Sequence, residues 1–487
     1  MKLTRVLVCT FLVVVFIVAV LIISILLTSS QKKRKVPNIL FIVADDLGWN
    51  DVSWHNKDII TPNLYQLAAQ GVILNQSYVQ PMCTPSRAAF LTGQYPFRYG
   101  LQHFVFGPVE PMGLPLSLKT LGQHLKLLGY NTHLMGKWHL GYCSREYTPT
   151  NRGFDSFIGF YTGLNAHFTH NRTVEFNGTT YNGYNLHENE TIQYRYNGTY
   201  STYLYAQRAI EVIKTAKYAP FFIFLALQSP HSPLEVPKKY FDMYPNEKNI
   251  ARRTYSGMVT AMDETVGKVI KTLKQSGQYD NTLIVFTSDN GGENIYGGNN
   301  WPLRGGKQTI WEGGTRVVGF VHSPLLKKGV ILATNQGIDG VDQWPMISKD
   351  GPSARNEIIY NIDNTTVYSA AIRIDDYKLI MGDAGGPNVW MTPDNVIEAK
   401  TSRKKMHLEW RKYYDTKVEW IQLYNLKIDP CETTNIASQH PQIVKALEKR
   451  LEELKKHVVP NIHLPLDTNG LPQKWSATFS PGWCQAV

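Results

Sequence analysis

Short runs of consecutive apolar residues alternate along the chain with longer segments whose apolar residues recur every three or four positions. The short runs are typical of strands buried inside a parallel sheet and lie at 39–43, 131–135, 221–227, 283–287 and 316–321. The longer segments predict helices at 62–70, 83–91, 117–128, 202–216 and 251–275. Strands that alternate with helices predict an α/β fold, in which helices cover both faces of a mainly parallel central sheet.

The pattern changes near residue 361, after which shorter strands are predicted at 366–372, 377–381 and 421–426, before a final helix at 442–457. Strands without helices between them favour an antiparallel sheet. A chain of 487 residues exceeds the usual size of one core. We therefore expect a larger α/β domain over 37–360 and a smaller C-terminal α+β domain over 361–487. We expect the polar segment 165–200 to be a surface excursion over the rim of the sheet.

The chain begins with an apolar run, from Val6 to Leu27, that is long enough to cross a bilayer and follows Lys2 and Arg5. Residues 1–36 therefore form a cleaved signal peptide or an uncleaved type II membrane anchor, and the pattern leaves both open. Either one sends the chain into the secretory pathway, for which we expect a lysosomal, extracellular or membrane-anchored destination. Glycosylation motifs of the form Asn-x-Ser/Thr fit this route and occur at Asn75, Asn171, Asn177, Asn189, Asn197 and Asn364.

The formal net charge of +11 favours a polyanionic partner. Basic residues gather between 400 and 412, although a solvated surface is the more common role of such a cluster. The sequence holds no nucleic-acid-binding motif, and entry into the secretory pathway argues against nucleic acid as the partner.

Pairs of oxygen-bearing side chains follow two of the predicted strands. Asp45 and Asp46 come directly after one buried strand, and Asp289 and Asn290 follow another. The carboxyl ends of parallel strands meet at one edge of a sheet, which is where ligands bind in open α/β folds. Carboxylate and amide oxygens without nearby histidine or cysteine clusters favour Ca²⁺ or Mg²⁺ over zinc. The sequence therefore predicts a site for a hard cation at this edge.

Lysine and histidine side chains are predicted at the same edge, in three different loops. Lys137 and His139 share one loop, His231 lies in a second and Lys307 in a third. A lone histidine is usually structural. Lysines beside a cation site suit the binding of an anion, and histidines there suit the protonation of a leaving oxygen.

Cys83 begins the polar turn Cys83-Thr84-Pro85-Ser86-Arg87, which leads into a predicted helix ended by Gly93. A buried structural cysteine is more often found within an apolar run. A phosphatase loop with a catalytic thiolate needs a longer spacing than the three residues that separate this cysteine from the arginine. A chemically modified cysteine is the third interpretation.

The turn at Cys83 resembles the signature of the sulfatase family. Other stretches resemble the same family and lie at 38–48, 136–141, 288–292, 298–305, 311–314, 423–426 and 429–430. The resemblance covers nearly all of the chain from Pro37 onward and is to the arylsulfatase B (N-acetylgalactosamine 4-sulfatase) branch. It implies an alkaline-phosphatase-like fold and a sulfuric ester hydrolase of the arylsulfatase type, acting on sulfated glycosaminoglycan sugars.

The resemblance also implies a modification and a metal ion. In the family, a formylglycine-generating enzyme oxidises the cysteine that corresponds to Cys83 after recognising cysteine, proline and arginine. The hydrated aldehyde attacks sulfur and then expels sulfate, and a plain thiol or alcohol does not allow this second step. One Ca²⁺ ion is implied, with ligands from Asp45, Asp46, Asp289, Asn290 and the residue made from Cys83.

The resemblance assigns roles to the remaining polar residues at the edge. Arg87 orients the hydrate, and His139 acts as a base when sulfate is expelled. Lys137 and Lys307 neutralise the sulfate oxygens, and His231 binds sulfate or protonates the leaving oxygen.

Around Val330 the chain lacks, by resemblance, about twenty residues that relatives carry, which is the size of a helix that packs on a sheet. A catalytically inactive homologue that binds sulfated glycans would fit this gap and the basic cluster at 400–412. A phosphodiesterase of the same superfamily is a second alternative. Such enzymes use serine or threonine with two transition metals, so Cys83 with Pro85 and Arg87 argues against it.

The cysteines allow one disulfide if Cys83 is kept for chemistry, because Cys9 lies in the apolar N-terminal run. The cysteines that the family places between 103 and 116 are absent, which leaves Cys143 without its usual partner. We expect Cys431 to pair with Cys484 and to hold the C-terminus in place.

Overall fold

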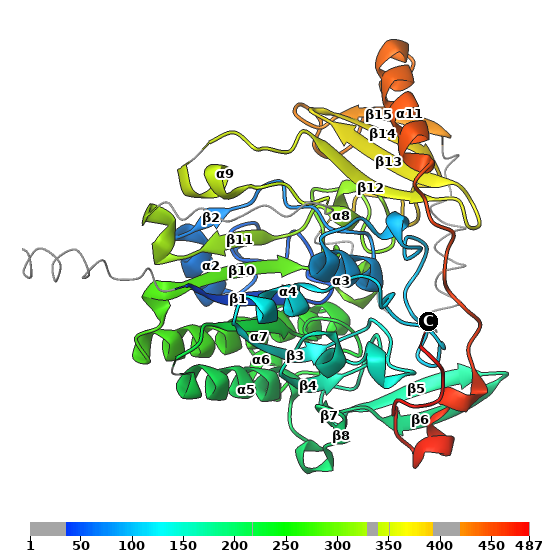
Figure 1. Cartoon of the computed structure of the whole chain (residues 1–487). Helices are drawn as coiled ribbons and strands as arrows, with labels where there is room; N and C mark the ends of the chain where they lie inside the picture. The colour runs from blue at the N-terminus through cyan, green and yellow to red at the C-terminus, as the bar shows by residue number, and fades with distance from the viewer. Residues whose placement is uncertain (1–35, 217, 329–338, 350, 393–418, 487) are drawn as a thin grey trace, which may run out of the picture. The chain divides into compact units, whose positions relative to one another are not determined.

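The computed structural model describes residues 36–216, 218–328, 339–349, 351–392 and 419–486 (Figure 1). The chain divides into two units, Met1–Pro37 and Asn38–Val487. The predicted membrane or signal segment, the gap around Val330 and the basic cluster at 400–412 lie outside the described residues. Within the described part of the chain, no helix combines the length and the apolar composition needed to cross a membrane.

A nine-stranded sheet forms the centre of the second unit among the described residues. Its strands follow the order β2 (Val72–Ile73), β11 (Gly319–His322), β10 (Thr282–Ser288), β1 (Asn38–Ala44), β9 (Phe221–Ala226), β3 (Asn131–Lys137), β4 (Ser156–Phe160), β7 (His187–Glu188) and β8 (Thr191–Ile192). The strands from β10 to β4 are parallel, whereas β11, β2 and β7 pair antiparallel with their neighbours towards the two edges. The parallel centre explains why these strands carry continuous apolar runs, since both faces are covered.

Helices cover both faces of the sheet, as predicted. Alternate residues of β1 point to opposite faces: Leu40 and Ile42 belong to one core cluster, and Phe41 and Val43 to another. The first cluster includes buried residues of α2 (Pro62–Ala69), α5 (Ser201–Thr215) and α7 (Ile250–Gln275). The second includes residues of α3 (Cys83–Thr92) and α4 (Leu121–Leu127), on the other side of the sheet in Figure 1.

Helix α4 begins later than the apolar pattern predicts, because a capping box fixes its start. The Thr120 side chain accepts a hydrogen bond from the backbone N–H of Gln123 at 3.2 Å. The Gln123 side chain in turn accepts one from the backbone N–H of Thr120 at 2.8 Å. The pair satisfies two N–H groups that the first turn of a helix leaves unbonded.

The predicted C-terminal antiparallel sheet is confirmed. It contains β12 (Glu357–Asp363), β13 (Ser369–Ile374), β14 (Tyr377–Gly382) and β15 (Ile421–Asn425) in this order. Helix α11 (Pro441–Lys455) packs Leu447, Leu451 and Leu454 against it. Strand β12 begins before the boundary at 360 that the sequence predicts.

The segment 165–200 is in part the expected surface excursion, but Asn165, His167, His170 and residues 183–187 are buried. It contains the hairpin of β5 (Asn171–Phe176) and β6 (Thr179–Tyr184), and it adds β7 to the edge of the central sheet. Asn165 and His187 are fully buried. A polar composition indicated exposure, but the buried Asn185 side chain has partners at both ends: Nδ2 donates to Thr162 Oγ1 at 2.8 Å, and Oδ1 accepts the backbone N–H of Tyr161 at 3.2 Å.

The expected pairing of Cys431 with Cys484 is wrong. The disulfide joins Cys143 to Cys484, and Cys431 is a free, half-buried thiol. The C-terminal tail passes beside the loop after β3, where the backbone N–H groups of Gly482 and Trp483 donate to the Cys143 carbonyl at 2.7 and 3.0 Å. This contact, formed between residues far apart in the sequence, places the two sulfur atoms together.

Candidate active site

The two predicted oxygen-bearing pairs meet at the carboxyl ends of β1 and β10. Ala44 and Ser288, the last residues of these strands, are partners in the parallel register, so the loops that follow lie side by side. Asp46 donates its backbone N–H to Asp289 Oδ1 at 3.2 Å, and Asn290 Nδ2 donates to Asp46 Oδ1 at 2.7 Å. All of these side chains are buried.

Cys83 reaches the same edge from the first residue of α3. The preceding Met82 has extended backbone, and Pro85 is tolerated in the first turn because its missing N–H would have no partner within the helix. The Cys83 Sγ atom lies 3.7 Å from Asp45 Oδ1. Gly93 ends the helix with a left-handed φ of 69°. Cys83 thus stands at a helix start, as predicted, with its sulfur atom near Asp45.

Arg87 lies one turn along α3 from Cys83, and its guanidinium is buried beneath the acidic loops. Its Nε and Nη2 atoms donate to Asp289 Oδ2 at 3.0 and 2.8 Å, and Nη1 donates to the Lys137 carbonyl at 3.2 Å. These bonds connect the helix to loops after two different strands. Arg87 therefore fixes the position of Cys83 relative to the carboxylates.

Each carboxylate of the first pair has an ammonium group beside it. Lys137 Nζ donates to both oxygens of Asp45 at 2.9 and 2.8 Å. Lys307 Nζ donates to Asp46 Oδ2 at 2.7 Å and to Glu293 Oε2 at 3.3 Å. Both lysines are buried, so their charges are little screened by water.

His231 enters this centre from the loop after β9. Its Nε2 atom lies 3.6 Å from Asp46 Oδ2. Its Nδ1 atom lies 2.5 Å from the carbonyl oxygen of Ser232, which accepts hydrogen bonds but donates none, so the hydrogen of a neutral ring is on Nδ1. Burial and the charge of Lys307 hold the pKa of His231 well below its ordinary value. The ring therefore presents a lone pair at Nε2.

His139 contacts α3 through its backbone, whereas its ring contacts the backbone of Phe106. Its backbone carbonyl accepts from Thr84 Oγ1 at 3.1 Å, and its Nε2 atom lies 3.1 Å from the Phe106 carbonyl. The Nδ1 atom is buried and has no hydrogen-bond partner among the described residues. Burial and the charge of Lys137 hold the pKa of His139 well below its ordinary value. The neutral ring has its free lone pair on Nδ1.

Burial is the largest single influence on the pKa values of Asp45, Asp289 and the Cys83 thiol in the centre. Burial and the neighbouring Asp289 carboxylate raise the pKa of Asp45, and burial raises the pKa of the Cys83 thiol to about 12. Burial acts in the same direction on Asp289, but the charges of Arg87 and Lys137 outweigh it and hold the pKa of Asp289 below its usual range. The unmodified thiol is therefore protonated at neutral pH.

The residues of the centre fit a hard cation. Donor atoms of Asp45, Asp46, Cys83 and His231 all lie within 4.8 Å of one another. Asn290 Oδ1 is buried and has no hydrogen-bond partner among the described residues, which leaves a carbonyl oxygen free to bind a cation. The carboxylate and amide oxygens are the donor types that Ca²⁺ prefers.

A second layer of polar residues supports the loop after β1, and sequence reasoning did not find it. The Tyr255 hydroxyl lies 2.9 Å from both the Asp46 carbonyl and Asp51 Oδ2, and it accepts the N–H of Gly48 at 3.2 Å. Arg252 Nη1 lies 2.5 Å from Asp51 Oδ1. Arg252 and Tyr255 are polar positions within the mainly apolar face of α7. This break in the apolar pattern is the feature of the sequence that could have predicted a buried polar contact.

A cavity of about 730 Å³ opens beside the centre. Its inner end is lined by Met82 and Pro85, which flank Cys83 in the sequence, and by Lys307. Its outer wall comes from the C-terminal sheet and includes Asp363 and Asp383. The cavity therefore borders the centre at Lys307 and at the start of α3.

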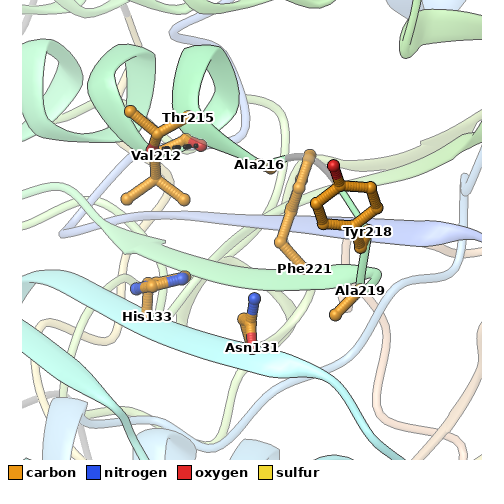
Figure 2. A pocket seen from close by; sticks show the side chains of 8 residues that line it. All are labelled: Asn131, His133, Val212, Thr215, Ala216, Tyr218, Ala219 and Phe221. Atoms are coloured by element: carbon orange, nitrogen blue, oxygen red, sulfur yellow. Dashed lines mark hydrogen bonds between the residues drawn. The ribbon is translucent and has the colours of Figure 1, made fainter.

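A second pocket, of about 410 Å³, lies at the opposite end of the strands (Figure 2). Asn131 and Phe221, the first residues of β3 and β9, line it together with residues at the end of α5. No carboxylate or thiol is among its described lining residues. The groups needed for catalysis thus gather at the carboxyl ends of the strands.

Comparison with known proteins identifies relatives of this chain. Residues 37–347 match the family described as Sulfatase. The chain is 40% identical to Arylsulfatase J of Mus musculus, over 91% of this chain and 80% of that protein. It is 35% identical to N-acetylgalactosamine-6-sulfatase of Rattus norvegicus, over 70% of this chain and 71% of that protein. It is similar to the crystal structure of Ps i-CgsB in complex with k-i-k-neocarrahexaose, with a TM-score of 0.72, 29% identity, and coverage of 89% of this chain and 96% of that chain.

Proposed function

This chain belongs to the sulfatase family and is a sulfuric ester hydrolase, and we propose that it cleaves sulfate esters of carbohydrates using Ca²⁺ and a formylglycine made from Cys83. The observation that carries the proposal is the position of Cys83. It lies at the start of α3, 3.7 Å from Asp45, where two lysines, an arginine and a histidine converge. An isolated structural cysteine has no need of these charges.

The formylglycine supplies the nucleophile for attack on sulfur, and Ca²⁺ supplies positive charge that stabilises the sulfate oxygens. Asp45, Asp46 and Asn290 are the residues whose oxygens would hold the ion, together with the residue made from Cys83. Asp289 would complete the set, and its bonds to Arg87 keep its carboxylate oriented towards the acidic loops.

The remaining polar residues bind and orient the ester. The ammonium groups of Lys137 and Lys307 neutralise charge that grows on the sulfate oxygens as the ester bond breaks. Arg87 holds the residue at position 83 in place through α3. The neutral His231 ring has only a lone pair at Nε2, so we propose that Nε2 takes up a proton when the anionic ester binds and then contacts a sulfate oxygen or passes that proton to the leaving oxygen. His139 is proposed as the base that regenerates the aldehyde, through its unpartnered Nδ1 atom.

The relatives and the cavity support a proposal about the substrate class. One relative is named for a sulfated N-acetylgalactosamine, and a similar structure holds an oligosaccharide. We propose glycosaminoglycan sugars as substrates and retain the arylsulfatase B branch as the predicted placement within the family. We also propose passage through the secretory pathway to the lysosome or cell exterior, with a formylglycine-generating enzyme as the maturation partner.

Replacement of Cys83 tests the proposal. Cys83→Ser should preserve the fold and lower kcat for an aryl sulfate by roughly 10⁴-fold or more, because an alcohol at this position is not regenerated. Cys431→Ser is a matched control, since Cys431 is the other free thiol among the described cysteines, and it should retain activity.

Mass spectrometry of the peptide that contains Cys83 completes the experiment. In protein made in the secretory pathway, the peptide should have the lower mass of an aldehyde instead of a thiol. Full activity of Cys83→Ser would refute the assignment. An unmodified thiol in the mature protein would favour an inactive homologue that binds sulfated glycans.

A further inference from the structure

The outer part of the 730 Å³ cavity carries a charge pattern that bears on the substrate, and the inference drawn from it rests on the proposed function. Asp363 and Asp383 line the outer wall, at the ends of β12 and β14. His103 lines the same cavity from the loop after α3, and its Nδ1 atom lies 2.6 Å from Asp363 Oδ2. Asp383 Oδ1 accepts the backbone N–H of Gly385 at 2.9 Å. Both carboxylates are therefore held in place.

Among the described residues, the side chains that line the outer cavity carry more negative than positive charge. They include two carboxylates, from Asp363 and Asp383, and one imidazole, from His103, so at least one negative charge has no counter-charge among these three side chains whichever protonation state the ring takes. Among the described residues that line the cavity, Lys307 is the single lysine or arginine. It lies at the inner end and donates to Asp46 and Glu293.

Apolar side chains are exposed along the same cavity. Phe104, Val367 and Trp420 line it, and their exposed fractions are 50%, 52% and 56%. Exposed aromatic rings beside carboxylates are suited to a sugar, because the ring covers the apolar face of the sugar and the carboxylates accept hydrogen bonds from its hydroxyl groups. The lining therefore fits a hydroxyl-rich, uncharged ring beside the one that bears the sulfate.

We infer that Asp383, together with Asp363, determines specificity by excluding substrates whose neighbouring sugar carries a carboxylate. Among the proposed glycosaminoglycan substrates, this favours chains in which the sugar next to the sulfated one is a neutral hexose or N-acetylhexosamine and not a uronic acid. A uronate held in the outer cavity would lie near at least one unbalanced carboxylate. Two like charges about 6 Å apart, at an effective dielectric constant of about 40, repel by about 1.4 kcal/mol, which weakens binding by about tenfold.

Two disaccharides that differ in one group measure this selection. The first is a sulfated N-acetylgalactosamine linked to glucuronate, and the second is the same molecule with the carboxylate reduced to a primary alcohol. The pair is made twice, once with the sulfate at position 4 and once with it at position 6 of the N-acetylgalactosamine. Each disaccharide competes with an aryl sulfate for the mature enzyme at about pH 6, where the uronate is ionised. We expect the reduced disaccharide to inhibit at about tenfold lower concentration.

The ratio of interest is the inhibitory concentration of the glucuronate disaccharide divided by that of its reduced form. Asp383→Asn should lower this ratio to less than about threefold, because the substitution removes the carboxylate charge that repels the glucuronate. Asp280→Asn is the matched control, because Asp280 is exposed at the amino end of β10 and the substitution changes the net charge equally. It should leave the ratio unchanged. High salt should also reduce the wild-type ratio, which a purely steric preference would not do.

The outcomes separate this inference from the proposed function. Equal inhibition by the two disaccharides, no inhibition by either, or an unchanged ratio in Asp383→Asn would overturn the inference while aryl sulfate hydrolysis continues. If the mature enzyme does not hydrolyse aryl sulfate, the proposed function fails. Calorimetric titration of Cys83→Ser with both disaccharides then measures the same ratio without turnover, and equal affinities would overturn the inference.

Discussion

A buried carboxylate between the two sheets should make the stability of the protein depend on pH. Lys378 of β14 lies 3.1 Å from Glu312 Oε1 and 2.7 Å from Glu432 Oε1, and the three side chains are buried. Glu312 belongs to α8 (Glu312–Thr315) and also accepts hydrogen bonds from Tyr78 and Tyr360 at 2.7 and 2.9 Å. One lysine thus serves two carboxylates, which favours a proton on one of them.

Burial and the charge of Glu312 outweigh the attraction of Lys378 and raise the pKa of Glu432 from 4.5 to about 7. Between these values the folded protein holds a proton that the unfolded chain has lost, so the free energy of unfolding falls as the pH rises. A shift of this size corresponds to about 3 kcal/mol, which is fully available below about pH 4.5 and lost above about pH 7.

Glu432→Gln replaces the titrating group with a neutral one of the same shape, so this contribution to the pH dependence disappears. For a folded unit of about 450 residues, 3 kcal/mol corresponds to about 3 °C in Tm. Differential scanning fluorimetry measures Tm for both proteins across this pH range. The difference in Tm, variant minus wild type, should increase by about 3 °C from about pH 5 to pH 7.5.

Glu175→Gln is the control for this experiment, because Glu175 is exposed on β5 and its replacement should leave the pH dependence of Tm unchanged. Parallel curves of Tm against pH for wild type and Glu432→Gln would show that Glu432 titrates alike in the folded and unfolded states. That result would refute the reasoning from burial and from the shared lysine.

Two further predictions concern the disulfide and the metal. Cys143→Ser should destabilise the protein by about 2–5 kcal/mol, seen as a lower Tm, and peptide mapping should find Cys143 joined to Cys484; a bond from Cys431 to Cys484 would contradict the structure. After chelation, adding Ca²⁺ at about 100 times its Kd should raise Tm by about 3 °C, and Asn290→Ala should reduce this rise. An equal rise in Asn290→Ala would show that the unpartnered Oδ1 atom does not bind the ion.

The sequence predicted the central fold because burial on both faces leaves a readable pattern. β1 and β10 are nearly continuous apolar runs, and each is followed directly by its polar pair. The resemblance to the sulfatase family is confirmed, and with it the mainly parallel sheet and the separate antiparallel C-terminal sheet. The roles of individual site residues stay predictions, although the structure brings Asp45, Cys83, Lys137 and their neighbours into one centre.

The sequence was less informative where long-range contacts decide the outcome. The direction of β11 was not predicted, since an apolar run has the same pattern in parallel and antiparallel strands. The segment 165–200 looked exposed because polar composition does not show which polar groups find partners inside the protein. The choice of Cys143 over Cys431 as the partner of Cys484 depended on where the tail crosses the loop after β3.

The sequence by itself determined the order of strands and helices and the short turn from Cys83 to Arg87, because these depend on local spacing and burial. Only the tertiary structure decided which charges surround that turn: Lys137 at the end of β3 and Lys307, 170 residues later in a loop, meet over neighbouring carboxylates. It also placed Asp363 and Asp383 of the C-terminal sheet along the cavity beside Cys83. The distance between two loops depends on how the whole chain packs. It cannot be predicted from the local pattern of apolar and polar residues in either loop.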